Sequence, residues 1–204
     1  YNHPSIFSWV LFNETWGLFS GKGNERAYLP ETQLWVKEMF KEAKALDQSR
    51  LIEDNSPCNY DHVETDLNTW HAYLPGYKWR EFLDNVVDNT YVGSEWNFIG
   101  GNKQTHVPML NSECGNLWGY HGSTGDVDWS WDYHIMMNEF RMHPAISGWL
   151  YTEHHDLINE WNGYYKYDRT EKITGLKDFI PDMELSHLHS KVYLSTGSEL
   201  CKSV

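Results

Sequence analysis

The stretch "NHPSIFSWVLFNETWG", residues 2–17, decides how the fold of this chain is interpreted. Its mostly apolar, β-favouring run is the pattern of a strand that is buried on both faces of a parallel sheet. The run ends directly on Asn13 and Glu14, an amide beside a carboxylate. Polar side chains at the carboxyl end of a buried parallel strand indicate a functional edge of the sheet.

The composition is that of an acidic globular protein. The chain has 204 residues, of which 40% are hydrophobic and 22% charged. The net charge of −13 argues against nucleic acid as a partner, because phosphate backbones are bound by clusters of Lys and Arg. No apolar run approaches the length of a membrane span, so no membrane partner is expected. The 11 Trp and 13 Tyr are typical either of a concave site with ligand-stacking rings or of a large aromatic core.

The cysteine and histidine patterns do not indicate a metal or redox site. Cys58, Cys114 and Cys201 are widely spaced and odd in number, so no disulfide framework is predicted. The densest histidine stretches, 152–156 and 187–189, match no zinc-binding spacing. These histidines are interpreted as structural or surface residues, and no metal site is predicted.

Predicted strands and helices alternate along the chain. The hydrophobic patterns predict strands at 5–13, 50–54, 66–73, 106–113 and 145–153, and helices at 30–47, 79–89, 126–143 and 169–180. In the first helix, Pro30 suits the first turn, and the predicted apolar face consists of Trp35, Met39, Ala43 and Leu46.

Such βα repeats indicate a parallel sheet, and two architectures are compatible with them. Five strands suit a doubly wound sheet, whereas a (β/α)8 barrel needs eight. No glycine fingerprint follows the first strand, which disfavours a dinucleotide-binding sheet. Polar residues instead follow the strands, namely Asn13-Glu14, Asp54-Asn55, His71 with Tyr73, Ser112-Glu113 and Thr152-Glu153. In a barrel these strand ends form one rim, so we predict the α/β class and a partial (β/α)8 TIM barrel, about strands 4 to 8, over residues 1–180.

The character of the sequence changes after Pro181. Residues 181–204 are rich in Ser and β-branched residues. This segment is interpreted as a linker and the first strand of a following β-sandwich domain. The chain is therefore expected to be part of a longer polypeptide whose remaining domains are its partners.

Two glutamates at predicted strand ends point to glycosidic bond cleavage. Glu14 follows the first strand and Glu113 the fourth, so both would project from the same rim. In a retaining glycosidase one carboxyl protonates the leaving oxygen and the other attacks the anomeric carbon, with the two about 5–5.5 Å apart. The acid must stay protonated, and an apolar wall, which Trp16 could supply, would raise its pKa. The alternative for each glutamate is a salt bridge or a helix cap.

Three sequence blocks resemble family 2 of the glycoside hydrolases, which contains β-galactosidases, β-glucuronidases and β-mannosidases. "NHPSIFSWVLFNETWG" is similar to the family's acid/base segment, and "VPMLNSECG", residues 107–115, to its nucleophile segment. "GWLYTEHHDLINEWNGYYKYDRTEK", residues 148–172, resembles the last strand of the barrel and its loop. The three blocks occur in the order and spacing of the family.

The resemblance implies roles for individual residues. Glu14 would be the general acid/base and Glu113 the nucleophile. Asn13 would donate a hydrogen bond to the sugar 2-hydroxyl, which fits a transition state with positive charge on the ring. Tyr73 would hydrogen-bond the nucleophile, and His71 would contact sugar hydroxyls.

Three further aromatic residues have two interpretations each. Tyr151 would form the floor beneath the sugar or, together with Trp149, pack in the barrel core. Trp118 and Trp161 would stack on sugar subsites or pack on the surface.

The chain departs from the family pattern at two positions. Cys114 follows the nucleophile, where an aromatic residue is common, and is interpreted as a small packing residue. Glu160 stands in the loop where glucuronidases carry a lysine that binds the substrate carboxylate. A uronic acid would face Glu160 unpaired, so a β-galactoside-like substrate is preferred.

The leading hypothesis is a retaining exo-β-glycosidase that acts by double displacement on terminal β-linked sugars. The alternatives are a catalytically inactive carbohydrate-binding family member and a barrel hydrolase of a cellulase-like family. No cofactor is expected to be required; some related β-galactosidases use Mg²⁺ and Na⁺, for which the sequence shows no complete ligand set. A homo-oligomer is compatible with the sequence, and periplasmic, extracellular and cytoplasmic locations all stay open.

Overall fold

The computed structural model describes residues 3–115, 130–158 and 160–171. The chain divides into two compact units. The first contains Tyr1–Ala72, Val87–Glu113 and Ala145–Trp149, and the second contains Tyr73–Val86, Cys114–Pro144 and Leu150–Val204. The predicted β segment at 181–204 and the predicted site residue Trp118 lie outside the described residues.

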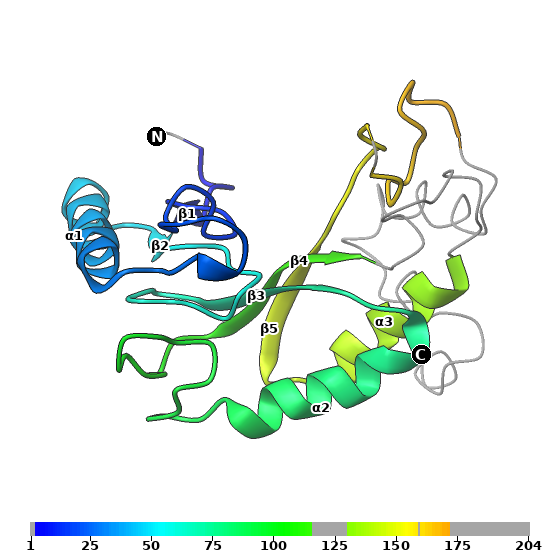
Figure 1. Cartoon of the computed structure of the whole chain (residues 1–204). Helices are drawn as coiled ribbons and strands as arrows, with labels where there is room; N and C mark the ends of the chain where they lie inside the picture. The colour runs from blue at the N-terminus through cyan, green and yellow to red at the C-terminus, as the bar shows by residue number, and fades with distance from the viewer. Residues whose placement is uncertain (1–2, 116–129, 159, 172–204) are drawn as a thin grey trace. The chain divides into compact units, whose positions relative to one another are not determined.

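The amino-terminal part of the first unit is a βαβ arrangement. β1 (Ser8–Val10) pairs in parallel with β2 (Leu51–Glu53), and Trp9 lies opposite Ile52. Between them, a short 3-10 helix, η1 (Gly23–Glu25), precedes α1 (Pro30–Leu46). Figure 1 shows α1 beside this strand pair. A βαβ unit with parallel strands is what the sequence pattern predicted.

Helix α1 buries a different face from the predicted one. Its buried residues are Val36 and Phe40, whereas Leu46 is 80% exposed and Trp35 is 44% exposed. The apolar stripe is thus displaced by one residue toward the carboxyl end of the chain. Val36 packs with Leu18 and Val63 in a buried cluster, and this contact fixes the helix orientation.

The remaining strands form a second sheet in the order β3 (Asn68–Tyr73), β4 (Met109–Gly115) and β5 (Ile146–Tyr151). The Asn68 N–H donates to the Pro108 carbonyl in the first unit, and the Leu74 N–H donates to the Gly115 carbonyl in the second. The Thr152 N–H donates to the Cys114 carbonyl. The partners of β3 and β4 advance in the same direction along both strands, as in a parallel pair.

The second unit contains the packed helices. A 3-10 turn, η2 (Gly76–Lys78), leads into α2 (Trp79–Asn89), whose last three residues belong to the first unit, and α3 (Ser130–Met142) lies alongside (Figure 1). The centroids of the Trp79 and Phe140 rings are 5.3 Å apart. A Cβ atom at Gly76 would lie 2.5 Å from Asp132 Oδ1, so this turn requires glycine.

The predicted alternation of strands and helices is confirmed as far as β5, but the strands do not form one continuous ladder. Residues 172–180 of the predicted helix at 169–180 lie outside the described residues. The predicted strand at 5–13 is only three residues long, and Asn13 continues it through a single bridge to Ser56. The strands β1 and β2 form one sheet and β3, β4 and β5 another. Side-chain hydrogen bonds, described below, connect β2 to β3 instead.

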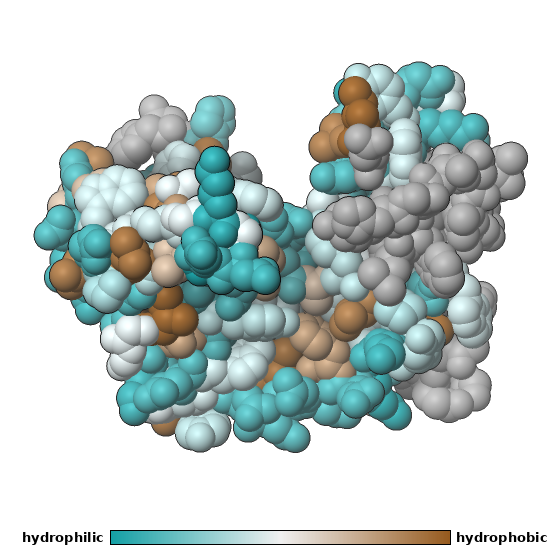
Figure 2. Space-filling model, viewed as in Figure 1, coloured by the Kyte–Doolittle hydropathy of each residue, from teal (hydrophilic) through white to brown (hydrophobic). Residues whose placement is uncertain are grey.

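The surface carries apolar side chains in small groups. Over the part that contains α1, β1 and β2, Figure 2 shows hydrophobic residues interspersed with hydrophilic ones. Leu34 and Leu46 of α1 are among the exposed apolar residues. Within the described ranges, no helix is both long and apolar enough to cross a bilayer.

The packing of α2 predicts a large difference between two leucine truncations. Leu83 is 0% exposed, whereas Leu34 is 64% exposed. We expect Leu83→Ala to lower the free energy of unfolding by about 2–5 kcal/mol, because it removes buried apolar contacts and leaves a cavity. Leu34→Ala should change it by about 0.5 kcal/mol or less. Urea unfolding followed by circular dichroism measures both, and equal losses would contradict the assigned packing.

Candidate active site

Three side chains from separate strand ends meet in the first unit. Glu14 follows β1, His71 is in β3, and Glu113 is in β4. His71 Nδ1 lies 2.7 Å from Glu14 Oε1 and 3.5 Å from Glu113 Oε2. One side-chain nitrogen or oxygen from each of the three residues lies within 4.8 Å of the others. The structure therefore brings together the two glutamates that the sequence analysis singled out.

The backbone at Glu14 has an uncommon conformation. Glu14 has φ 52° and Thr15 has φ 60°, the left-handed region that non-glycine residues rarely adopt. The Glu14 N–H donates to the Ser56 carbonyl at 2.8 Å, and the Trp16 N–H donates to the Asn13 carbonyl at 3.0 Å. Two consecutive left-handed residues form a tight turn that directs the Glu14 side chain toward His71.

Thr15, Asn55 and Asp61 hold this turn in place through a closed ring of buried hydrogen bonds. The Thr15 hydroxyl donates to Asp61 Oδ2 at 2.6 Å and accepts from Asn55 Nδ2 at 2.9 Å. Asn55 Nδ2 also donates to Asp61 Oδ1, and Asn55 Oδ1 accepts from the Thr15 N–H. All three residues are less than 5% exposed, so the ring fixes the turn beside Glu14 to the loop that follows β2.

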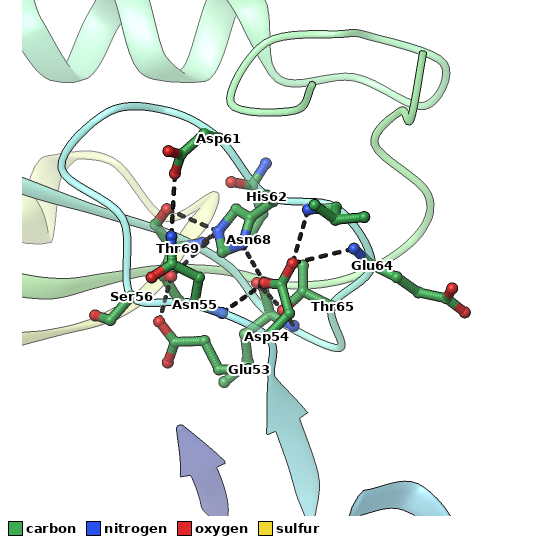
Figure 3. A network of polar contacts seen from close by, with 12 residues as sticks. Glu53, Asp54, Asn55, Ser56, Asp61, His62, Glu64, Thr65, Asn68 and Thr69 are labelled. Carbon is green, nitrogen blue, oxygen red and sulfur yellow. Dashed lines mark hydrogen bonds and ion pairs between the residues drawn. The ribbon is translucent and has the colours of Figure 1, made fainter. Parts of the chain in front are cut away.

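A second set of buried bonds organises that loop around Asp54 (Figure 3). His62 Nδ1 donates to Asp54 Oδ1 at 2.6 Å, and both side chains are fully buried. Asp54 Oδ2 accepts from the Val63 and Glu64 N–H groups. The Thr69 hydroxyl of β3 donates to Glu53 at the end of β2. These contacts join β2 to β3 where no backbone ladder does.

Burial and polar partners act in opposite directions on the pKa of His62 and on the pKa of Glu53. Burial lowers the pKa of His62, but the Asp54 carboxylate outweighs burial and the pKa is raised. Burial raises the pKa of Glu53, against hydrogen bonds from Thr69 and Ser56. The network thus holds several ionisable groups that stay buried only because they are paired.

His71 uses both ring nitrogens on protein groups. Its side chain is 2% exposed, with Nδ1 at Glu14 and Nε2 at 2.7 Å from the Ser56 hydroxyl. The Ser56 hydroxyl in turn donates to Ser112 Oγ at 2.8 Å. Sequence reasoning gave His71 a contact with sugar hydroxyls, whereas the structure places it as a support between the two carboxylates.

The pKa of Glu14 is shifted in the direction opposite to the expected one. The hydrogen bond from His71 lowers the pKa of Glu14, burial opposes it, and a bond from Trp16 Nε1 at 2.9 Å lowers it further. Trp16 is 64% exposed, so it forms no apolar wall. The expectation that Trp16 would raise the pKa of Glu14 is wrong because its indole N–H points at the carboxylate.

The same cluster is the candidate place for a cation. Among the described residues, Glu14, His71 and Glu113 are the one group of three or more His, Cys, Asp or Glu residues whose ligand atoms come close enough to hold a metal ion. Carboxylate oxygens and imidazole nitrogen are ligands that divalent cations accept. In the structure these atoms are paired with one another.

Of the other predicted site residues that the structure describes, Asn13 belongs to the first unit. Asn13 is exposed at the bridge to Ser56. Tyr73, Tyr151 and Trp161 belong to the second unit. Tyr151 packs edge-on against Tyr133, and its hydroxyl donates to the Asn162 carbonyl at 2.8 Å. Burial raises the pKa of the Tyr151 hydroxyl well above its usual value.

Sequence reasoning missed the residues that support the cluster. Ser56 bonds to His71, and Thr15 and Asp61 hold the turn at Glu14. The sequence did flag Asp54-Asn55 and Ser112 as polar residues at strand ends. Thr15 and Asp61 carried no such signal, because a hydrogen bond between residues 46 positions apart leaves no periodic pattern.

Comparison with solved structures shows which enzymes share this fold. No family model matches the chain, and no curated protein matches its sequence. A GH2 β-galacturonidase from Eisenbergiella tayi matches with a TM-score of 0.57 and 20% identity over 85% of this chain. A β-glucuronidase from Bacteroides uniformis matches with a TM-score of 0.58 and 19% identity over 84% of this chain. A β-glucuronidase from Faecalibacterium prausnitzii matches with a TM-score of 0.53 and 17% identity over 84% of this chain.

These matches establish a fold of the glycoside hydrolase family 2 type. The chain spans 32%, 23% and 30% of the lengths of the three enzymes, so it corresponds to about a quarter to a third of each. At this level of identity the likeness concerns the fold alone.

The Asp54–His62 pair should be essential for the stability of this region. We expect Asp54→Asn to lower the free energy of unfolding by about 3–5 kcal/mol, because it breaks a buried pair and its backbone bonds. The exposed pair Asp84–His143, in which Asp84 is 61% exposed, is a matched control. Asp84→Asn should cost less than about 1 kcal/mol. Chemical denaturation measures both, and a small loss for Asp54→Asn would contradict the proposed support.

The hydrogen bond from Trp16 predicts a measurable pKa change. Trp16→Phe removes a donor to the ionised carboxylate, so the pKa of Glu14 should rise. The pKa of Glu14 is lower in the folded state than in the unfolded state. Ionised Glu14 therefore stabilises the fold at pH values above its unfolded-state pKa, and this stabilisation is lost as the pH falls through its folded-state pKa. Carboxyl ¹³C NMR titration of Glu14 measures the shift; an unchanged or lower value would exclude the bond in solution.

Proposed function

We propose that this chain carries the two catalytic carboxylates of a retaining β-glycosidase. The observation that supports the proposal is the convergence of Glu14 and Glu113 on His71, with one carboxylate oxygen of each within 4.8 Å of the other. Carboxyl groups about 5–5.5 Å apart are typical of retention, because no water fits between the nucleophile and the anomeric carbon. Side-chain exposures of 21% and 24% leave both glutamates open to a ligand.

The proposed reaction has two steps. Glu113 forms a bond to the anomeric carbon while the glycosidic C–O bond breaks and the leaving oxygen takes a proton from Glu14. Water then gives a proton to Glu14 and attacks the same carbon, which releases the sugar from Glu113. The double displacement preserves the anomeric configuration and needs no cofactor in this scheme.

We further propose that the described residues are the carboxyl-terminal strands of a (β/α)8 barrel, about strands 4 to 8. The parallel pairing of β1 with β2, the strand order β3-β4-β5 and the matches to family 2 enzymes support this assignment. Asn13, Tyr73, Tyr151, Trp118 and Trp161 are proposed as sugar contacts on the family resemblance alone.

For the substrate we propose a terminal β-galactoside-like sugar, with a uronide as the second candidate. The matched structures are named as β-glucuronidases and a β-galacturonidase, which favours the uronide. Glu160 argues against it, because it places an acid in the loop where those substrates would need a cation. A panel of nitrophenyl β-galactoside, β-glucuronide and β-galacturonide decides between them.

The roles of the two glutamates predict different kinetic losses. With an activated nitrophenyl glycoside, Glu113→Gln should lose about 10⁴-fold or more in kcat/KM, because no covalent intermediate forms. Glu14→Gln should retain a burst of nitrophenol, because this leaving group needs little protonation, and then turn over slowly. Stopped-flow absorbance on the purified protein measures both phases.

Glu95→Gln is the matched control, because Glu95 forms an exposed ion pair with Lys103. It should retain the wild-type rate. Undiminished turnover by Glu113→Gln would overturn the mechanism. Binding of a sugar by a wild-type protein that hydrolyses none of the panel would favour the inactive carbohydrate-binding alternative.

A further inference from the structure

The loop that follows Glu14 carries an arginine that is packed against two aromatic rings. The guanidinium carbon of Arg26 lies 4.4 Å from the centroid of the Phe19 ring and 5.7 Å from the centroid of the Trp16 ring. Trp16 in turn donates a hydrogen bond to Glu14 Oε2 at 2.9 Å. A cation therefore stands one aromatic ring away from the proposed general acid, and the proposed mechanism gives it no part.

The backbone of this loop is held by its own contacts. Ser20 and Ala27 form an antiparallel bridge in which each N–H donates to the other residue's carbonyl at 2.9 Å. Leu18, which lies between the two rings in the sequence, is 5% exposed and packs in the buried cluster with Val36 of α1. A surface that is already in place before a ligand arrives loses less entropy on binding.

The positive charge of Arg26 has no carboxylate partner in the part of the chain that the structure describes. Arg50 and Arg80 form ion pairs with acids, whereas Arg26 forms none with a described residue. The N–H groups along the edge of a guanidinium match a carboxylate, which arginine binds through two parallel hydrogen bonds. Because the chain has a net charge of −13, such a cation is also the local feature that would make an anionic ligand acceptable.

The proposed role of Glu14 defines which part of a substrate would reach this loop. A general acid protonates the leaving oxygen, so the leaving group must lie against Glu14. Trp16 is bonded to the Glu14 carboxylate and is 64% exposed, so it is the next surface that a leaving group would meet. An exposed indole face is suited to stacking on a flat ring. A ring stacked on Trp16 would bring its far end toward Arg26.

We propose that Trp16 and Arg26 form a subsite for the leaving group of the substrate, and that this subsite prefers a flat aromatic group that carries a carboxylate. Trp16 stacks on the ring, and Arg26 binds the carboxylate while Phe19 supports the guanidinium. The inference rests on the proposed function for its kinetic consequence, but binding of the aromatic carboxylate needs no hydrolysis. The subsite selects among glycosides and takes no part in the chemistry at the anomeric carbon.

The binding test uses two probes that differ only in charge. One is a methoxynitrobenzoate, in which a methyl group stands in place of the sugar, and the other is its methyl ester. Proton–nitrogen correlation NMR follows the indole N–H of Trp16 and the Nε–H of Arg26. We expect the carboxylate to shift both signals at a lower concentration than the ester. Added salt should reduce this difference, because the ion pair is exposed.

The matched control for this titration is Arg80, whose side chain is 65% exposed. Arg26→Gln should abolish the difference between the two probes at the Trp16 signal, whereas Arg80→Gln should keep it. Identical titrations by the carboxylate and the ester in the wild-type protein, or no shift with either, would overturn the proposal whether or not the protein hydrolyses a glycoside.

The kinetic test compares a nitrophenyl glycoside that carries a carboxylate beside its nitro group with the methyl ester of the same compound. Both are built on the sugar that the protein hydrolyses best. The ratio of their kcat/KM values isolates the carboxylate, because the sugar and the scissile bond are the same. Arg26→Gln should lower this ratio about fivefold at low ionic strength, the upper range for an exposed ion pair. Arg26→Lys should keep part of the preference, because an ammonium group has the charge without the planar fork.

Arg80→Gln should leave the ratio at its wild-type value. A ratio that is equal in the wild type and in Arg26→Gln would overturn the proposal. If the wild-type protein hydrolyses none of the glycosides, the proposed function fails, and the NMR titration still decides whether Trp16 and Arg26 bind an aromatic carboxylate.

Discussion

The hydrogen bond between His71 and Glu14 is the constraint on which the rest of the site depends. It joins the end of β1 to β3, and the longer contact from the same nitrogen reaches Glu113 on β4. Two carboxylates this close repel each other unless positive charge or a shared proton lies between them. A buried imidazole meets that need, because it can carry the charge and its ring is held on the opposite side by Ser56. Three strand ends are thereby drawn to one point.

Glu14 makes this bond from an uncommon backbone conformation, and a buried polar network holds the turn beside it. Left-handed residues other than glycine cost about 1–3 kcal/mol each, and Glu14 and Thr15 both adopt this conformation. The ring formed by Thr15, Asn55 and Asp61 gives partners to the Thr15 N–H, the Thr15 hydroxyl and both Asp61 carboxylate oxygens. A satisfied network in a low-dielectric interior is more rigid than a set of apolar contacts. The turn therefore presents its carboxylate in one orientation.

The sequence predicted the order of elements well, because periodic apolar patterns report directly on buried faces. Helix α2 matches its predicted range of 79–89, and the predicted strand 66–73 contains β3. The predicted buried face of α1 was displaced by one residue from the observed one. Trp35 and Val36 are both apolar, and only tertiary packing decides which of them is buried. The site was predicted as two glutamates at strand ends, but not its supports. Thr15 and Asp61 meet through space, and an isolated Thr or Asp in a loop is too common to be noticed.

The lowered pKa of Glu14 is compatible with a role as general acid once the arrival of a substrate is considered. In the free protein, His71 and Trp16 stabilise the ionised carboxylate, while burial opposes them. A sugar seated against Glu14 and Glu113 would remove water from both and strengthen the effect of burial, which raises carboxyl pKa values. In this arrangement His71 and Trp16 favour the ionised form of Glu14 in the free protein, and burial by a substrate would favour the protonated form that a general acid needs.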